Sequence, residues 1–202
     1  MRVIAGFLRS RTLQAPAGLA TRPTSDRLRE TLFNVLGGRV QGAVFLDLYA
    51  GSGAVGIEAL SRGARRVEFV EQSSAALKVL RANLARLDLN AGFGIHAASV
   101  RAFLGRTAGA AAGPRDRGER EPADLVFLDP PYDATAEYAA TMGLLGAAAS
   151  GLLAAGALVV AEHRRSTGGK RFLEDRHGRL ERVRLLEQGD AALSFYAASA
   201  VG

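Results

Sequence analysis

A glycine-rich segment with acids on either side is the part of this sequence best suited to bind a ligand. In FLDLYAGSGAVGIEAL, residues 45–60, the glycines at 51, 53 and 56 have the spacing G-x-G-x-x-G, which is typical of loops that bind nucleotide cofactors. Glu71 follows Gly51 by twenty residues, where its carboxylate could accept hydrogen bonds from two ribose hydroxyls. The pattern predicts an adenosine-type ligand. The alternative is a tight turn that only allows close helix packing.

Charge separates two classes of such ligands. A dinucleotide carries a pyrophosphate, which the carboxylates of Asp47 and Asp129 would repel if both strand ends lie side by side at the loop. S-adenosylmethionine carries no phosphate, and carboxylates favour its sulfonium and ammonium groups. The acids therefore predict S-adenosylmethionine. A nicotinamide-dependent oxidoreductase stays open as an alternative, although we can place no catalytic proton donor for it.

The second stretch with chemical potential is LVFLDPPYD, residues 125–133, an apolar run that ends in an acid, two prolines and a tyrosine. Asp129 and the backbone carbonyl of Pro130 could accept both N–H bonds of an exocyclic amino group, whose lone pair would then attack an electrophile. Both prolines fix their own φ, and we expect them to hold this carbonyl outward. Tyr132 offers a ring on which an extruded base can stack. The alternative is a strand end with a half-buried tyrosine.

The elements that must position these residues follow an α/β pattern. Apolar runs at 43–50, 65–71, 92–99, 123–129 and 156–163 predict strands of a mostly parallel sheet. Between the second and third strands, leucines at 77, 80, 84 and 87 predict one apolar helix face. Two further strands around the turn at 188–190 predict a C-terminal antiparallel hairpin. The charged segment 105–122 has no periodicity, and we expect an exposed, mobile loop without an assigned role.

The first forty residues predict a separate N-terminal extension, followed by the main domain at 41–202. Strand-like alternation comes first, which favours a β-hairpin. A helix is then expected to begin near Thr24 and to end at Gly37, with Leu28, Leu32, Phe33 and Leu36 on one face.

Composition narrows the class of protein. The 202 residues have a formal net charge of +6, mostly from arginine, which suits phosphate backbones but also fits an ordinary solvated basic surface. Cysteine is absent and the three histidines lack ligand spacing, so we expect no metal. No apolar run has the length of a membrane span or of a signal peptide, so we expect a cytoplasmic protein with no membrane partner.

These motifs resemble those of a known family. D-x-x-A-G-S-G, Glu71 and D-P-P-Y are similar to the motifs of amino-group methyltransferases, and the flanking RVIAG, TRPTSDRLRETLFN (21–34) and LSFY (193–196) resemble the RsmD family of bacterial rRNA guanine-N2 methyltransferases. The resemblance implies a Rossmann-like class I fold with a seven-stranded sheet and a small N-terminal extension that docks RNA. It also implies methyl transfer from S-adenosylmethionine to a guanine N2 in 16S rRNA, within the small ribosomal subunit or its assembly intermediate. We expect a monomer.

The resemblance also implies roles by position. The residues expected at the cofactor are Asp47, Tyr49, Gly51, Ser52, Gly53, Glu71, Gln72, Ser99 and Val100. Those expected at the target base are Asp129, Pro130, Pro131 and Tyr132, and those expected on RNA or closing over the site are Arg9, Arg11, Arg22, Thr24 and Arg29.

Some features leave room for other interpretations. Ser99 stands where such enzymes often have an acid, which leaves the Val100 amide as the adenine contact, and segment 105–122 is longer than usual. Methylation of adenine N6 in DNA or of a protein glutamine, and a non-catalytic RNA-binding protein, remain alternatives. For Arg22, Thr24, Asp26 and Arg29 the alternative is a helix cap with surface ion pairs.

Overall fold

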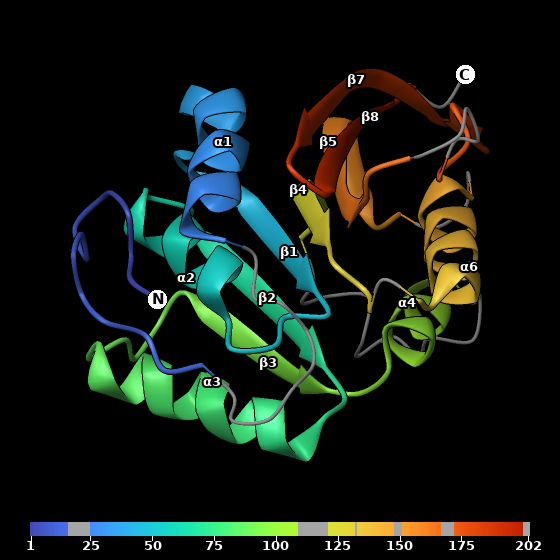
Figure 1. Cartoon of the computed structure of the whole chain (residues 1–202). Coiled ribbons are helices and arrows are strands. Elements are labelled where there is room, and N and C mark those ends of the chain that lie inside the picture. The colour runs from blue at the N-terminus through green and yellow to red at the C-terminus, as the bar shows by residue number, and fades with distance from the viewer. Residues whose placement is uncertain (16–24, 109–120, 132, 148–150, 167–171, 200–202) are drawn as a thin grey trace. The chain divides into compact units, whose positions relative to one another are not determined.

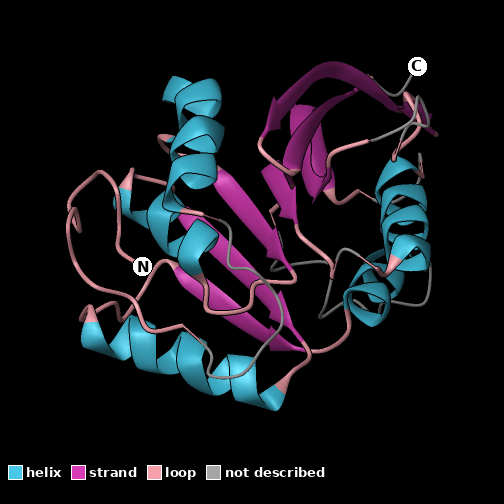
Figure 2. Cartoon of the chain, viewed as in Figure 1, coloured by secondary structure: helices cyan, strands magenta, loops and turns pink. Residues whose placement is uncertain are grey.

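A computed structural model gives the fold, and it describes residues 1–15, 25–108, 121–131, 133–147, 151–166 and 172–199 (Figure 1). The chain divides into two compact units, Met1–Ala98 and Ser99–Gly202. Each unit combines strands with helices, as the α/β pattern of the sequence predicts (Figure 2).

The first unit contains three parallel strands in the order β3-β2-β1. They are β1 (Val44–Leu48), β2 (Arg66–Glu71) and β3 (Phe93–Ala97). Helix α2 (Ala54–Ser61) connects β1 to β2, and α3 (Ser74–Arg86) connects β2 to β3 (Figure 1). All five residues of β1 are buried, which explains why its sequence is a continuous apolar run around a single acid.

The predicted apolar face of α3 is confirmed. Leu77, Leu80 and Leu84 are buried, and Leu87 is buried directly after the helix end. Ser73 begins the helix, because its hydroxyl accepts a hydrogen bond from the Ala76 amide.

The N-terminal residues of this unit contain one helix, α1 (Asp26–Leu36), followed by a short 3-10 turn, η1 (Gly37–Val40). The predicted stop at Gly37 is confirmed, since it caps α1 with a positive φ of 52°. The helix begins slightly later than expected, because the Ser25 side chain caps it by accepting from the Leu28 amide. Thr24 lies outside the described residues.

The β-hairpin expected before α1 is reduced to one isolated antiparallel bridge, Arg2 to Thr12. Residues 1–15 instead form a compact turn whose amides bond to side chains of the same unit. They are grouped with β1–β3 by their contacts, whereas the sequence predicts a division after residue 40. The role of 1–40 as an RNA-docking extension stays a prediction.

The second unit contains a mixed sheet in the order β4-β5-β8-β7-β6. Its strands are β4 (Ala123–Leu128), β5 (Leu153–Arg164), β6 (Arg176–His177), β7 (Leu180–Gln188) and β8 (Ala191–Ala198). Strands β4 and β5 are parallel, whereas β8 is antiparallel to both β5 and β7. The predicted C-terminal hairpin is therefore confirmed. Helices α4 (Val100–Ala108) and α6 (Thr135–Gly146) complete the unit.

Two expectations need correction. The described residues contain eight strands instead of seven, because the two-residue strand β6 pairs with the start of β7. The loop expected from residue 105 begins later, because α4 continues to Ala108; residues 109–120 lie outside the described part. Within the described residues, no helix is long and apolar enough to cross a membrane.

Candidate cofactor and substrate site

The glycine loop follows β1 directly and turns sharply into α2. Three residues have positive φ: Tyr49 at 61°, Gly51 at 56° and Gly53 at 79°. The Gly53 amide donates to the Ala50 carbonyl at 2.7 Å, which closes the turn before Gly53 caps α2. Glycine adopts this conformation without strain, and at Gly53 an added Cβ would also lie 2.3 Å from Cδ1 of Leu80.

The third glycine of the motif serves packing. A Cβ added at Gly56 would lie 2.2 Å from Cε1 of Phe69 and 2.9 Å from Oδ2 of Asp47. Helix α2 therefore lies directly against β2 and β1, and the close-packing interpretation of the motif holds for this position. The ligand-loop and close-packing interpretations of the glycine pattern are thus compatible, since Gly51 and Gly53 shape the loop and Gly56 allows the packing.

Asp47 lies beneath the loop. Its side chain is 2% exposed, and Oδ2 accepts a hydrogen bond from the Gly56 amide at 2.9 Å. Burial raises the pKa of Asp47 to about 7; the Gly56 bond opposes this shift and the negative charge of Glu71 adds to it. The expected contact of Asp47 with the cofactor stays a prediction. Through the Gly56 bond its carboxyl also holds the start of α2.

Glu71 lies at the end of β2 and bonds both to the glycine loop and to the residue that caps α3. Its Oε2 accepts from the Gly51 amide at 2.9 Å, and Oε1 accepts from the Ser73 amide at 2.7 Å. The side chain is half-buried, and each carboxylate oxygen has a further lone pair for a hydroxyl donor. Gln72 follows in an exposed position, and Tyr49 is half-buried. The structure therefore brings Glu71 to the glycine loop, as the sequence predicts.

Asn83 is a loop-holding residue that the sequence analysis misses. It is 1% exposed on α3, and its Nδ2 donates to the Ser52 carbonyl at 3.0 Å and to the Gln14 carbonyl at 3.1 Å. Its Oδ1 accepts from the Gln14 amide at 2.8 Å. The available signal is an asparagine between Leu80 and Leu84 on an otherwise apolar face, where a buried amide needs partners.

In the second unit, Ser99 and Val100 begin α4. The Ser99 hydroxyl accepts from the Ala102 amide at 3.2 Å, so its side chain serves as a helix cap. Val100 is the first residue of α4 and is buried, and its amide belongs to the first turn, where N–H groups lack a helical carbonyl partner. This position suits the predicted backbone contact to an adenine ring.

The D-P-P-Y segment follows β4, as predicted. Asp129 is half-buried and Pro130 is buried. The one proton of the buried Tyr138 hydroxyl faces two carbonyls, that of Glu162 at 2.8 Å and that of Pro130 at 3.2 Å, so the Pro130 carbonyl is the more distant of two acceptors. The expectation that the prolines hold this carbonyl simply outward is therefore corrected, because one lone pair faces an inner tyrosine.

The next carbonyl along the segment is also occupied. Pro131 is exposed, and its oxygen accepts from the Ala134 amide at 2.8 Å, which closes a turn before α6. This turn leads the chain away from the end of β4. Tyr132, the predicted stacking residue, lies outside the described residues.

The predicted RNA contacts divide into three groups. Arg9 and Arg11 are exposed, whereas Arg22 and Thr24 lie outside the described residues. The prediction for Arg29 is wrong in this structure, because its side chain is 0% exposed. Its guanidinium donates to the Arg2 carbonyl and to Asp26, and its Nε lies 3.7 Å from Glu58. A buried cation of this kind cannot reach a phosphate.

The predicted site residues thus fall in both units. Asp47, the glycine loop and Glu71 are brought together in the first unit, and Ser99, Val100 and the D-P-P-Y segment belong to the second. The side-by-side placement of Asp47 and Asp129 joins the two units and stays a prediction.

Known proteins resemble this chain in sequence and fold. YlbH of Bacillus subtilis (strain 168) is 44% identical over 132 residues, which cover 65% of this chain and 67% of YlbH. Ribosomal RNA small subunit methyltransferase D of Escherichia coli (strain K12) is 37% identical over 132 residues, 65% of this chain and 60% of that protein. The aligned part of the E. coli relative is therefore less than two thirds of its length.

Among solved structures, the E. coli protein YhhF has a TM-score of 0.79 and 33% identity, and the match covers 100% of this chain and 99% of YhhF. This likeness confirms the Rossmann-like methyltransferase fold. Residues 1–197 match the family described as conserved hypothetical protein 95. The chain therefore belongs to this family, and its motif resemblance to the RsmD methyltransferases is confirmed.

Proposed function

We propose that this chain transfers a methyl group from S-adenosylmethionine to the exocyclic N2 of one guanine in 16S rRNA. The substrate is the small ribosomal subunit or its assembly intermediate, and the enzyme acts as a monomer in the cytoplasm. Family membership and the name of the E. coli relative support an rRNA substrate. The motif resemblance supports guanine N2 over adenine N6 or a protein glutamine. Membership in a methyltransferase family also favours this activity over a nicotinamide oxidoreductase.

The observation that carries the proposal is the acid-flanked glycine loop. Glu71 bonds to the Gly51 amide, and Asp47 bonds to the Gly56 amide beneath the same loop. Glu71 suits the ribose of either cofactor, whereas the ionised form of Asp47 beneath the loop disfavours a pyrophosphate and favours a ligand with a sulfonium and an ammonium group. The free lone pairs of Glu71 suit ribose hydroxyls. The residues present therefore fit S-adenosylmethionine.

When bound, S-adenosylmethionine would supply a methyl group carried on a positively charged sulfur. After transfer, the sulfur remains with the cofactor as a neutral thioether. Asp129 accepts one N–H of the guanine amino group and takes the proton released as the nitrogen–carbon bond forms. The second lone pair of the Pro130 carbonyl accepts the other N–H, while Tyr138 occupies the first. Stacking on Tyr132 holds the extruded base in place.

Labelled methyl transfer tests this function. The protein is incubated with radiolabelled S-adenosylmethionine and small ribosomal subunits from cells lacking this modification, and the product is digested and mapped by base. We expect label on one guanine of 16S rRNA. Absence of label from the RNA overturns the proposal, and label on an adenine or on protein favours the corresponding alternative.

Asp129→Ala tests the catalytic assignment. We expect transfer to fall by at least about a hundredfold, the lower end for a positioned acid–base group, with little change in S-adenosylmethionine affinity. Asp133→Ala is the matched control, because Asp133 is an acid in the same segment whose side chain is 96% exposed. Near-normal transfer by the Asp129 variant contradicts the assigned role.

A further inference from the structure

Phe7 is exposed to solvent, unlike the other phenylalanines of the chain. The chain has nine phenylalanines, all of them in the described residues, and Phe7 is the one that is exposed, at 70%. The other eight are buried or half-buried. A single exposed apolar residue is common on protein surfaces, so its meaning depends on how the backbone presents it and on what surrounds it.

The backbone around Phe7 is held firmly against α2. The turn Ala5–Arg11, here named the N-terminal turn, bonds to the last residue of that helix: the Phe7 amide donates to the Ser61 carbonyl at 2.9 Å, and the Leu8 amide donates to Ser61 Oγ at 3.0 Å. Just before the turn, the Ile4 amide donates to buried Glu58 at 2.7 Å.

Gly6 makes this close approach possible. Its φ is +81°, and an added Cβ would lie 1.7 Å from the Ser61 carbonyl oxygen. A residue other than glycine would push the N-terminal turn away from α2. The aromatic ring is therefore presented on a fixed backbone, which lowers the entropy lost when a partner covers it.

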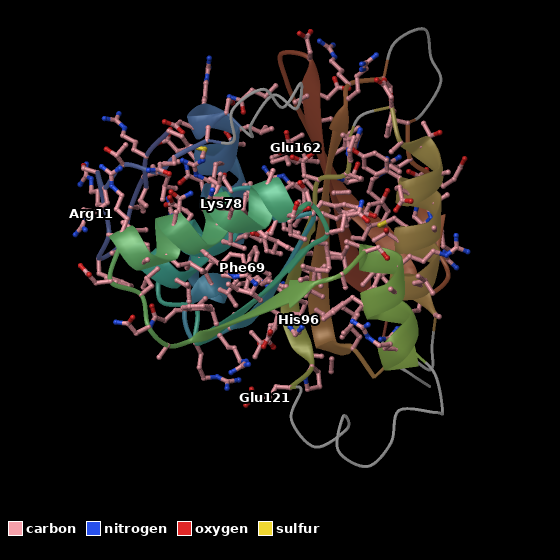
Figure 3. All side chains as sticks on the ribbon, turned by 90° about the horizontal axis from the view of Figure 1, so that it is seen from below. Arg11, Phe69, Lys78, His96, Glu121 and Glu162 are labelled. Atoms are coloured by element: carbon pink, nitrogen blue, oxygen red, sulfur yellow. The ribbon has the colours of Figure 1, made fainter. Side chains whose placement is uncertain are left out.

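The surroundings of Phe7 are basic. Residues 1–15 contain Arg2, Arg9 and Arg11 and no acid, and all three arginines are exposed. Arg11 lies at the outer edge of its unit (Figure 3), where its guanidinium also donates to the Arg86 carbonyl at 3.1 Å. An exposed ring in a turn that also carries exposed arginines suits a partner that offers flat apolar faces joined by negative charges.

Single-stranded RNA has this chemistry. Unpaired bases stack on aromatic side chains, and arginines bind the phosphates between them. A protein partner would need a broader apolar patch, and among the described residues of the first unit Phe7 is the one large apolar side chain that is exposed. We propose that Phe7 stacks on an unpaired base of the RNA substrate while Arg9 and Arg11 contact the flanking phosphates. This inference rests on the proposed function and identifies the N-terminal turn as the surface that docks the RNA substrate.

Direct RNA binding tests the docking surface separately from methyl transfer. The probes are a fluorescent single-stranded RNA oligonucleotide and unmodified small ribosomal subunits. We expect Phe7→Ala to weaken binding of both probes about tenfold, and Phe7→Tyr to bind nearly as wild type, because tyrosine also stacks. Arg9→Gln should reduce the slope of log affinity against log salt by about one.

Val183→Ala is the matched control, since Val183 is a 60% exposed apolar residue outside the N-terminal turn. We expect it to leave RNA affinity unchanged. In the transfer assay Phe7→Ala should raise KM for the ribosomal particle about tenfold with an unchanged kcat. Unaltered RNA affinity of Phe7→Ala, or equal loss in Phe7→Ala and Phe7→Tyr, overturns the stacking role. Failure of the proposed function appears differently, as absence of transfer by the wild-type protein.

Discussion

The buried carboxyl of Asp47 should make the stability of this protein depend on pH. Its pKa is about 7 in the folded chain against 3.8 in a free side chain, so the folded state binds this proton more tightly than the unfolded state. The stabilising effect of the proton is complete below about pH 4 and is lost as the pH rises through 7. The shift corresponds to about 4 kcal/mol in the free energy of unfolding.

Asp47→Asn isolates this effect. The amide keeps an oxygen that can accept from the Gly56 amide but does not ionise. Urea unfolding of both proteins, followed by circular dichroism, gives the difference in unfolding free energy at each pH. We expect this difference to shift in favour of the variant by about 2 to 3 kcal/mol between about pH 5 and about pH 8. A difference that stays constant over that range would refute the raised pKa and the burial that causes it.

The same proton should link Asp47 to the cofactor. A ligand with a positive charge near the loop favours the ionised carboxyl, so binding lowers the pKa of Asp47 and releases a proton. Calorimetric affinity for S-adenosylmethionine should therefore increase as the pH rises through about 7. The increase attributable to this group should be missing in Asp47→Asn.

Three further substitutions test the contacts around the site. Tyr138→Phe removes the hydroxyl whose proton is shared by the Glu162 and Pro130 carbonyls and should lower kcat about tenfold, with S-adenosylmethionine affinity unchanged in calorimetry. Glu71→Gln presents an amide NH₂ to one of two N–H donors and should weaken S-adenosylmethionine binding by about tenfold or more. Asn83→Ala leaves buried backbone groups without this partner and should lower the free energy of unfolding by about 2 kcal/mol in urea titration.

A control for Tyr138→Phe separates an effect on the position of the Pro130 carbonyl from a general loss of stability. Tyr196→Phe also removes a tyrosine hydroxyl that bonds to a carbonyl, that of Glu174 at 2.8 Å. It should lower stability to a similar extent while leaving kcat unchanged. If Tyr138→Phe and Tyr196→Phe lower kcat equally, the hydroxyl of Tyr138 has no specific effect on the Pro130 carbonyl. Unchanged cofactor affinity in Glu71→Gln would likewise contradict the ribose assignment.

Features of the site that depend on local backbone chemistry were predictable from the sequence. The glycine loop must turn between a strand and a helix, and Glu71 must follow at the end of the next strand, because parallel strands place their carboxyl ends at one edge. The leucine spacing of α3 and the turn at 188–190 are likewise set by period and turn chemistry. These predictions depend on residues close together in the chain.

Features that depend on distant partners were not predictable in the same way. Arg29 has the composition of a surface cation, yet Asp26, the Arg2 carbonyl and Glu58 enclose it. In the sequence, Asn83 is a polar residue on an otherwise apolar helix face. Its hydrogen bonds to Gln14 and to the Ser52 carbonyl explain its burial. Hydropathy reports the average cost of burying a side chain. Particular partners offset that cost for Asn83, and only in part for Arg29, whose Nε and Nη1 are buried without a hydrogen-bond partner among the described residues.

Helix α2 connects the two proposed binding regions of the first unit. Its first end is capped by Gly53 of the cofactor loop, and its last residue, Ser61, holds the N-terminal turn that presents Phe7. Eight residues of α-helix span about 12 Å, and α2 packs so closely on β2 at Gly56 that an added Cβ would lie 2.2 Å from Cε1 of Phe69. Rigid spacing of this kind means that RNA docked on Phe7 is held at a fixed separation from the glycine loop. A base-specific transfer requires such a separation, because the reacting nitrogen must meet the methyl group within a few tenths of an ångström.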